Sequence, residues 1–125
     1  MSSGTPWEST IGYPRAVRMG DHISVAGTTA TAENGAVIGK GDVAAQTRYA
    51  LQKIERALKE AGASLAYVVR TRMFVTHLAD WEIIGRVQGE FFDDVRPAAS
   101  MVEVARLIDP DHLVEIAVDA FLEGR

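Results

Sequence analysis

Two arginines and three carboxylates occupy strand-like segments of this sequence, and their side chains are the ones best suited to chemistry. Arg70 and Arg72 alternate along one segment, while Glu103, Glu115 and Asp119 lie on two later ones. An arginine can hold a carboxylate through two parallel hydrogen bonds. We interpret Arg72 first as a structural partner of Glu103 or Glu115, from the same chain or another copy. A ligand-binding cation is the alternative role for Arg72.

Other chemistries find little support in the sequence. His22, His77 and His112 are widely separated and lack the spacing of metal ligands. Ser100 does not follow the pattern of a nucleophile elbow, and Gly39-Lys40-Gly41 is too short for a phosphate loop. The chain contains no cysteine, which excludes disulfides and thiolate sites. We predict neither a metal nor a cofactor.

Length and composition are typical of a small globular protein. The chain has 125 residues, so we predict a single domain over residues 1–125. Its net charge is −4, and no cluster of lysine and arginine stands out, so nucleic acid is not expected as a partner. No apolar run approaches the roughly 20 residues that cross a bilayer. We expect a cytoplasmic protein that does not associate with membranes.

The spacing of apolar residues predicts two helices and several strands. Asp42 is a candidate N-cap for a helix that ends at Gly62, and Asp80 for a second helix that ends at Arg96-Pro97. The second helix should turn a stripe that includes Trp81 toward the core. Strands are expected over 15–19, 22–26, 67–76, 99–107 and 113–122, with shorter extended runs over 28–31 and 36–38. This order favours an α+β fold in which both helices cover one face of a mixed sheet.

The last two predicted strands indicate how the two faces of the sheet differ. Alternate residues of the final strand, from Val114 to Leu122, are all apolar and should face the helices. We assign Met101 and Glu103 to the opposite face, together with Arg72. That face mixes large apolar groups with charges, so we expect other copies of the chain to cover it.

Several motifs resemble those of one known family, the RidA/YjgF proteins. The segment from Arg96 to Leu107, RPAASMVEVARL, and the following Val114-Glu115-Ile116 are similar to the C-terminal signature of that family. Ile11-Gly12-Tyr13, Ala26-Gly27, Asp42-Val-Ala-Ala-Gln-Thr47 and Val69–Val75 match in order and spacing. The resemblance covers nearly the whole chain.

The resemblance implies a chorismate-mutase-like fold and a homotrimer in which three sheets enclose a central β-barrel, with clefts between subunits. It also implies hydrolysis of enamine and imine acids to 2-oxo acids and ammonia. That chemistry needs an arginine for the substrate carboxylate and a polar group that handles water. In this chain Ala99 stands at the position of that arginine, and Ala117 at the position of the water-handling glutamate. A cysteine, an asparagine and a serine of the family align with Met101, Gly85 and Ala26. Tyr13 matches a family tyrosine.

We therefore predict a divergent RidA-like trimer that binds a small metabolite in its intersubunit clefts, with weak or altered deaminase activity. An active deaminase of different specificity is the first alternative. The second alternative is the endoribonuclease or translation-inhibitor activity that is often attributed to this family. The lack of a basic, aromatic-lined groove argues against this alternative. The expected cleft residues are Tyr13, Ala26, Gly27, Arg72, Gly85, Ala99, Met101, Glu103 and Ala117.

Overall fold

The computed structural model describes residues 15–123, which form one sheet covered by two helices. The strands are β1 (Ala16–Met19), β2 (His22–Thr28), β3 (Val68–Val75), β4 (Ala98–Glu103) and β5 (Val114–Phe121). Their order in the sheet is β1-β2-β5-β3-β4, and only the β3–β4 pair is parallel. The predicted α+β class and mixed sheet are confirmed.

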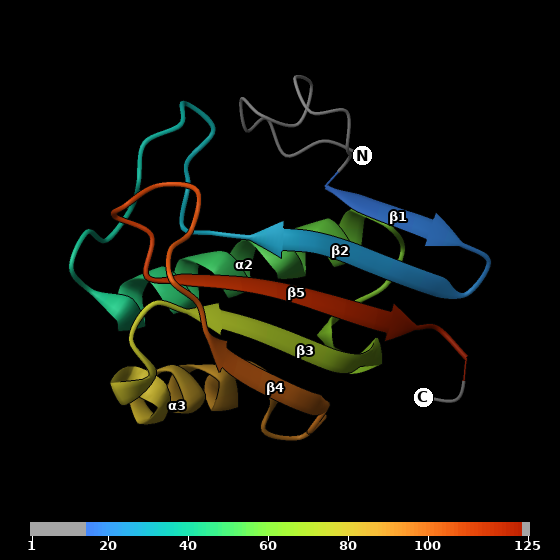
Figure 1. The fold of residues 1–125 in the computed structure, drawn as a ribbon. Helices are drawn as coiled ribbons and strands as arrows, with labels where there is room; N and C mark the ends of the chain where they lie inside the picture. The colour runs from blue at the N-terminus through green and yellow to red at the C-terminus, as the bar shows by residue number, and fades with distance from the viewer. Residues whose placement is uncertain (1–14, 124–125) are drawn as a thin grey trace.

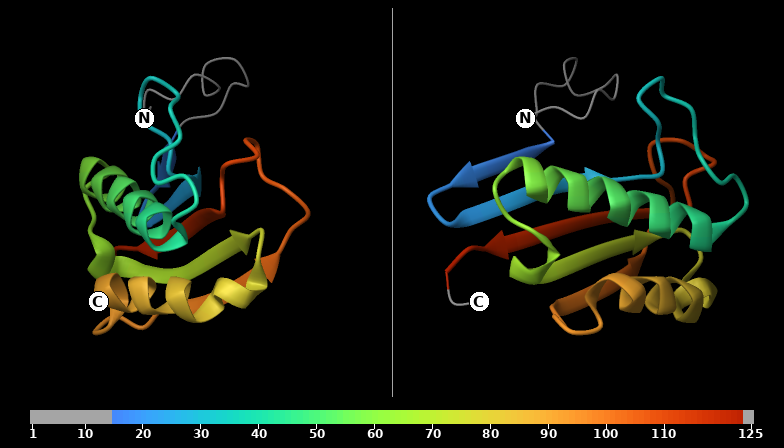
Figure 2. Two further views of the ribbon diagram at one scale, coloured as in Figure 1. Left: turned by 90° about the vertical axis from the view of Figure 1, so that its left-hand side faces the viewer. Right: turned by 180° about the vertical axis from the view of Figure 1, so that it is seen from behind.

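Both helices lie on the same face of the sheet, as Figures 1 and 2 show. Helix α2 (Val43–Glu60) begins where the carboxylate of Asp42 accepts a hydrogen bond from the Ala45 amide at 3.0 Å. It ends at Ala61, and Gly62 follows with a φ of 89°, a conformation that favours glycine. The predicted N-cap and C-terminal glycine are both confirmed.

Helix α3 (Trp81–Phe92) carries the chain from β3 to β4. Ile84, Val87 and Phe92 are buried, but Trp81 is 56% exposed, so the prediction that it faces the core is wrong. A bidentate ion pair joins the two helices, since Nε and Nη2 of Arg48 lie 3.2 and 2.8 Å from the carboxylate oxygens of Glu90. Two short 3₁₀ helices, Leu65–Tyr67 and Leu78–Asp80, precede β3 and α3.

The hydrophobic core lies between the sheet and the helices. In β5 the residues Val114, Ile116, Val118 and Ala120 are buried, as their alternation predicted. Leu51, Ile54 and Leu58 of α2 are fully buried in the same cluster. Burying a side chain of this size contributes about 1.5–3 kcal/mol to folding. The core therefore holds β5, the central strand of the sheet, against α2.

The first of the two C-terminal strands is shorter than the sequence predicted. β4 ends at Glu103 and not at Leu107. β4 and β5 are not neighbours, because β3 lies between them. The extended runs predicted over 28–31 and 36–38 form only an isolated bridge between Thr31 and Val37.

The face assigned to β4 is also wrong. Parallel pairing sets Met101 beside Met73 and Ser100 beside Arg72. Met101 therefore lies on the helix side, packed against the core, and Val102 lies on the opposite side with 47% of its surface exposed. Alternation along a strand separates two faces, but only pairing identifies which face meets the helices.

Within residues 15–123, no helix combines the length and apolar character needed to span a lipid bilayer.

Candidate functional site

The sheet face opposite the helices carries most of the chemically active side chains. We call it the open face, and it is toward the viewer in Figure 1. Strand register places the following residues on it: His22, Ser24, Arg72, Phe74, Glu115, Ala117, Asp119 and Phe121.

The carboxyl group of Glu115 lies against an irregularity in β2. The register between β2 and β5 shifts between Val25 and Thr28, so that Ala26 and Gly27 together lie opposite the single residue Ala117. A Cβ added at Gly27 would lie only 2.8 Å from Cδ of Glu115. Gly27 therefore leaves the space that the carboxyl group fills.

The surroundings of Glu115 favour its protonated form. Burial raises the pKa of this carboxyl above its usual range, and the positive charge of Arg15 opposes that shift. A carboxyl whose pKa is raised by burial binds a proton more readily than a solvated one, and general acid–base catalysis needs a group that can both accept and donate a proton.

Arg72 lies on the same face, one residue pair along the sheet from Glu115. Arg72 pairs with Ala117 across β3 and β5, and Phe74 pairs with Glu115. Diagonal neighbours of this kind have Cα atoms roughly 7–8 Å apart. Ala117 and Phe74 lie at the other two corners, so a small and a large side chain flank the diagonal between the cation and the carboxyl.

Within the chain, Arg72 pairs with Asp119 and not with Glu103 or Glu115. Nη1 of Arg72 lies 3.6 Å from one carboxylate oxygen of Asp119. The other oxygen accepts a hydrogen bond from Ser24 at 2.9 Å and lies 3.5 Å from Nε2 of His22. The ring of Phe121 stacks on His22, with centroids 4.6 Å apart. Asp119 thus connects β2, β5 and β3.

Serine, histidine and aspartate meet here, but their arrangement is not that of a hydrolase triad. The hydroxyl of Ser24 contacts both Asp119 and Nε2 of His22, at 2.9 and 3.2 Å. In a triad the histidine uses different nitrogens for the serine and the aspartate. This cluster therefore does not prepare Ser24 for nucleophilic attack.

The predicted cleft residues fall into two groups. Ala26, Gly27, Arg72 and Ala117 lie on β2, β3 and β5 around the open face. Tyr13 lies outside the described residues.

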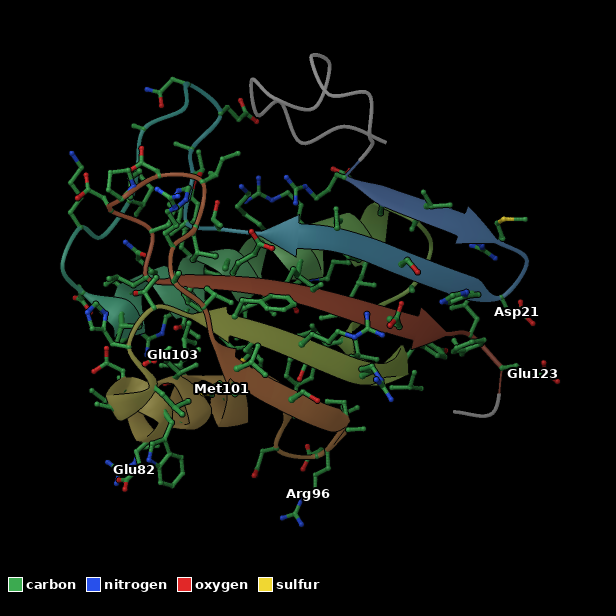
Figure 3. The ribbon with its side chains drawn as sticks, in the orientation of Figure 1. Asp21, Glu82, Arg96, Met101, Glu103 and Glu123 are labelled. Atoms are coloured by element: carbon green, nitrogen blue, oxygen red, sulfur yellow. The ribbon has the colours of Figure 1, made fainter. Side chains whose placement is uncertain are left out.

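The second group comes from β4 and α3. Met101 and Glu103 lie on β4, close to α3 (Figure 3). An oxygen of Glu103 accepts a hydrogen bond from the Leu78 amide at 2.9 Å, so Glu103 ties the end of β4 to the start of the α3 region. Ala99 and Gly85 are exposed, and open space surrounds the Cα of Gly85. One chain alone does not bring this group onto the open face.

Sequence reasoning missed Glu115 as a site residue. It had placed the water-handling glutamate at Ala117, two positions further along the same face. The signal was present, because Glu115 follows Val114 inside the C-terminal motif, but its contact with Gly27 depends on the register shift in β2. Among the described residues, no group of three histidine, aspartate or glutamate side chains is arranged to hold a metal ion.

Comparisons with known proteins agree with this geometry. The family model described as endoribonuclease L-PSP matches residues 5–122. The crystal structure of Rv2704 from Mycobacterium tuberculosis, a member of the YjgF/YER057c/UK114 family, has 51% sequence identity and a TM-score of 0.89 over 98% of this chain and 97% of its own. The YjgF gene product of Escherichia coli has 31% identity and a TM-score of 0.83 over 98% and 96% of the two chains.

A curated relative carries a defined activity in its name. The 3-aminoacrylate deaminase RutC of Acinetobacter baylyi is 39% identical over 84% of this chain and 82% of its own length. Together with the matching fold and the family match over nearly the whole sequence, these likenesses show that the chain belongs to the RidA/YjgF family, also described as endoribonuclease L-PSP.

Proposed function

We propose that this protein assembles as a homotrimer and binds a small enamine or imine acid in clefts between copies, with deaminase activity that is weak or altered relative to typical family members. The observation that carries the proposal is the Glu115 carboxyl at the Gly27 bulge, where burial raises its pKa. The name of the RutC relative supports the reaction class.

The proposed chemistry is hydrolysis of a carbon–nitrogen double bond. Water adds to the imine carbon while the Glu115 carboxylate takes its proton. The protonated Glu115 then donates that proton to nitrogen, and the carbinolamine collapses to a carbonyl compound and ammonia. An enamine substrate first takes up a proton at carbon to become the imine. A carboxyl whose pKa is raised by burial suits the return of the proton to nitrogen, because its protonated form is favoured.

Assembly is expected because of the surface that the open face leaves in one chain. Val17 and Met19 pair with Ser24 and His22, which places both side chains on this face, and Met19 is 76% exposed. Phe121 and Val102 are also exposed there. An apolar patch around buried and half-buried charges is typical of an interface. In a cleft between copies, the group containing Ala99 and Gly85 would meet the open-face residues of a neighbour.

Ammonia release from freshly generated 2-iminopropionate and 3-aminoacrylate tests the proposal, with a typical family member as positive control. We expect slower turnover than the control, because no arginine stands at position 99. Glu115→Gln should abolish the remaining activity, whereas Glu33→Gln, on an exposed loop, should not change it. Full activity in Glu115→Gln would contradict the proposed role.

A deaminase of different specificity is the second candidate, and the position of Arg72 favours it. Arg72 is half exposed on the face that holds Glu115, and its contact with Asp119 is too long for a hydrogen bond. Its guanidinium can therefore turn toward a substrate carboxylate. If it does, Arg72→Ala should raise KM while assembly persists, and Arg86→Ala on the outer surface of α3 should not. Loss of assembly in Arg72→Ala would assign it to the interface instead.

A further inference from the structure

Arg15 is a buried cation at the edge of the proposed site. It comes directly before β1, and its carbonyl accepts a hydrogen bond from the Ala26 amide at 2.9 Å. Only 3% of its surface is exposed. Its Nη1 donates to the carbonyl of Gly27 at 3.2 Å and to the hydroxyl of Thr28 at 2.8 Å. Arg15 therefore holds the segment of β2 where the register shifts.

The same segment forms the seat of the Glu115 carboxyl. The space above Gly27 is filled by that carboxyl, and the carbonyl of Gly27 accepts a hydrogen bond from the Arg15 guanidinium. The hydroxyl of Thr28 in turn donates to the Ala26 carbonyl at 2.8 Å. A chain of hydrogen bonds thus runs from Arg15 through Thr28 to Ala26, around the position of the catalytic carboxyl.

Charge gives a second link between the two side chains. A buried guanidinium and a nearby carboxylate stabilise each other's charged forms. Burial raises the pKa of Glu115, and the positive charge of Arg15 lowers it. The protonation state of Glu115 is therefore a balance between burial and this one cation.

We infer that Arg15 is a positioning residue for Glu115: its guanidinium fixes the β2 bulge that seats the carboxyl and places a positive charge near it. The inference rests on the proposed function, in which Glu115 transfers the protons. Arg15 acts through Glu115 and through the backbone of Gly27, and it does not contact substrate.

Removing Arg15 should have two separable effects. Without the charge, Glu115 keeps its proton to higher pH, so the acidic limb of the pH profile moves upward. Without the guanidinium, the bulge loses the two bonds that Nη1 donates to Gly27 and Thr28, and the carboxyl is less well placed. Lysine retains the positive charge but lacks the planar guanidinium group. Arg15→Lys therefore separates the effect of the charge on Glu115 from the effect of the hydrogen bonds on the bulge.

The experiment compares Arg15→Gln and Arg15→Lys with Arg18→Gln in the intact protein. Arg18, in the adjoining strand β1, is a matched control, because it also donates to main-chain carbonyls, those of Gly20 and Ala61. Two quantities are measured: the pH dependence of kcat and KM for ammonia release, and the titration of the Glu115 carboxyl by ¹³C NMR, assigned with Glu115→Gln. Thermal unfolding verifies that each variant is folded.

We expect Arg15→Gln to shift the Glu115 titration upward and to lower kcat with little change in KM. Arg15→Lys should restore the titration while kcat stays reduced, and Arg18→Gln should match the wild type in both. An unchanged Glu115 titration in Arg15→Gln would overturn the inference. If that variant does not fold, Arg15→Lys decides, because wild-type kcat in a folded lysine variant would overturn the positioning role.

The NMR titration does not require turnover, so it separates two kinds of failure. Wild-type protein that releases no ammonia would contradict the proposed function. The Glu115 titration would still show whether Arg15 controls the carboxyl.

Discussion

The carboxyl group of Glu115 fills the space above the backbone of Gly27, where any larger residue would place its Cβ. A single glycine on β2 thus determines where a carboxyl on β5 can lie. The contact brings together residues 88 positions apart in the sequence, on strands that are neighbours in the sheet.

Gly27→Ala should therefore displace the carboxyl and lower ammonia release by about 10–100-fold, because small misplacements of a catalytic group cost that much. The free energy of unfolding should change by less than about 1 kcal/mol, since the displaced atoms end a flexible side chain. Parallel assays of turnover and urea unfolding measure both effects.

Gly89→Ala is a matched control, because open space surrounds this helical glycine. It should leave turnover unchanged and stabilise the protein by about 0.5–1 kcal/mol through helix propensity. Equal turnover in the Gly27 and Gly89 variants would contradict the role of Gly27.

The ion pair between Arg72 and Asp119 should contribute little to stability. Its atoms are 3.6 Å apart, and 48% of the Arg72 side chain is exposed. A double-mutant cycle with Arg72→Met and Asp119→Asn should give a coupling energy below about 1 kcal/mol. A larger coupling, measured by urea unfolding, would indicate that the pair is part of the structural framework and not available to a ligand.

Gln46 of α2 should contribute far more to the stability of the fold than the ion pair between Arg72 and Asp119. It is fully buried, donates to the carbonyls of Gly39 and Asp111 at 3.3 and 2.9 Å, and accepts from the Leu113 amide at 2.8 Å. Gln46→Ala leaves buried main-chain groups without partners, so the free energy of unfolding should fall by about 2 kcal/mol or more.

Gln52, exposed on the same helix, provides the control for that substitution. Gln52→Ala should change stability by no more than about 0.5 kcal/mol. Similar losses in the two variants would mean that the three bonds of Gln46 contribute nothing specific.

His112 should make the protein sensitive to acid. Its side chain is buried, with Nε2 2.9 Å from the Thr31 hydroxyl, and Nδ1 has no hydrogen-bond partner within residues 15–123. Burial lowers the pKa of His112, and the charge of Lys53 lowers it further, against opposing effects of Asp109 and Asp111. The unfolded chain therefore binds a proton more readily than the folded one.

Stability should consequently fall as the pH drops through the ordinary histidine pKa of about 6.5. Urea unfolding at about pH 7.5 and about pH 5.5, on either side of that value, should show a smaller loss in His112→Gln than in the wild type. His22 and His77 are unchanged in the comparison, so an equal loss in both proteins would exclude His112 as the cause.

Much of the fold could be predicted from local patterns. Residues close together in the sequence determine the apolar stripe of α2, its cap at Asp42 and its end at Gly62. The same holds for the alternation of buried residues along β5. Pairing is not local. Both Met101 and Val102 are apolar, and nothing along β4 shows that Met101 will meet Met73 under the helices.

The candidate site depended on pairing in the same way. Arg72, Gly27 and Ala117 could be chosen from residue types and family motifs. The contact between Glu115 and Gly27 could not be predicted, because it depends on a register shift between two strands far apart in the sequence. Arg15 likewise becomes relevant only when β1 and β2 place it behind Gly27.

The position of β5 also bears on how the protein is made. Although it comes last among the strands, it lies in the middle of the sheet, with β1 and β2 on one side and β3 and β4 on the other. Until residues 114–121 are synthesised, a nascent chain therefore lacks the strand that joins the β1–β2 pair to the β3–β4 pair. Only when residues 114–121 emerge can the two pairs join, so chains interrupted before that point should expose both unpaired edges to aggregation.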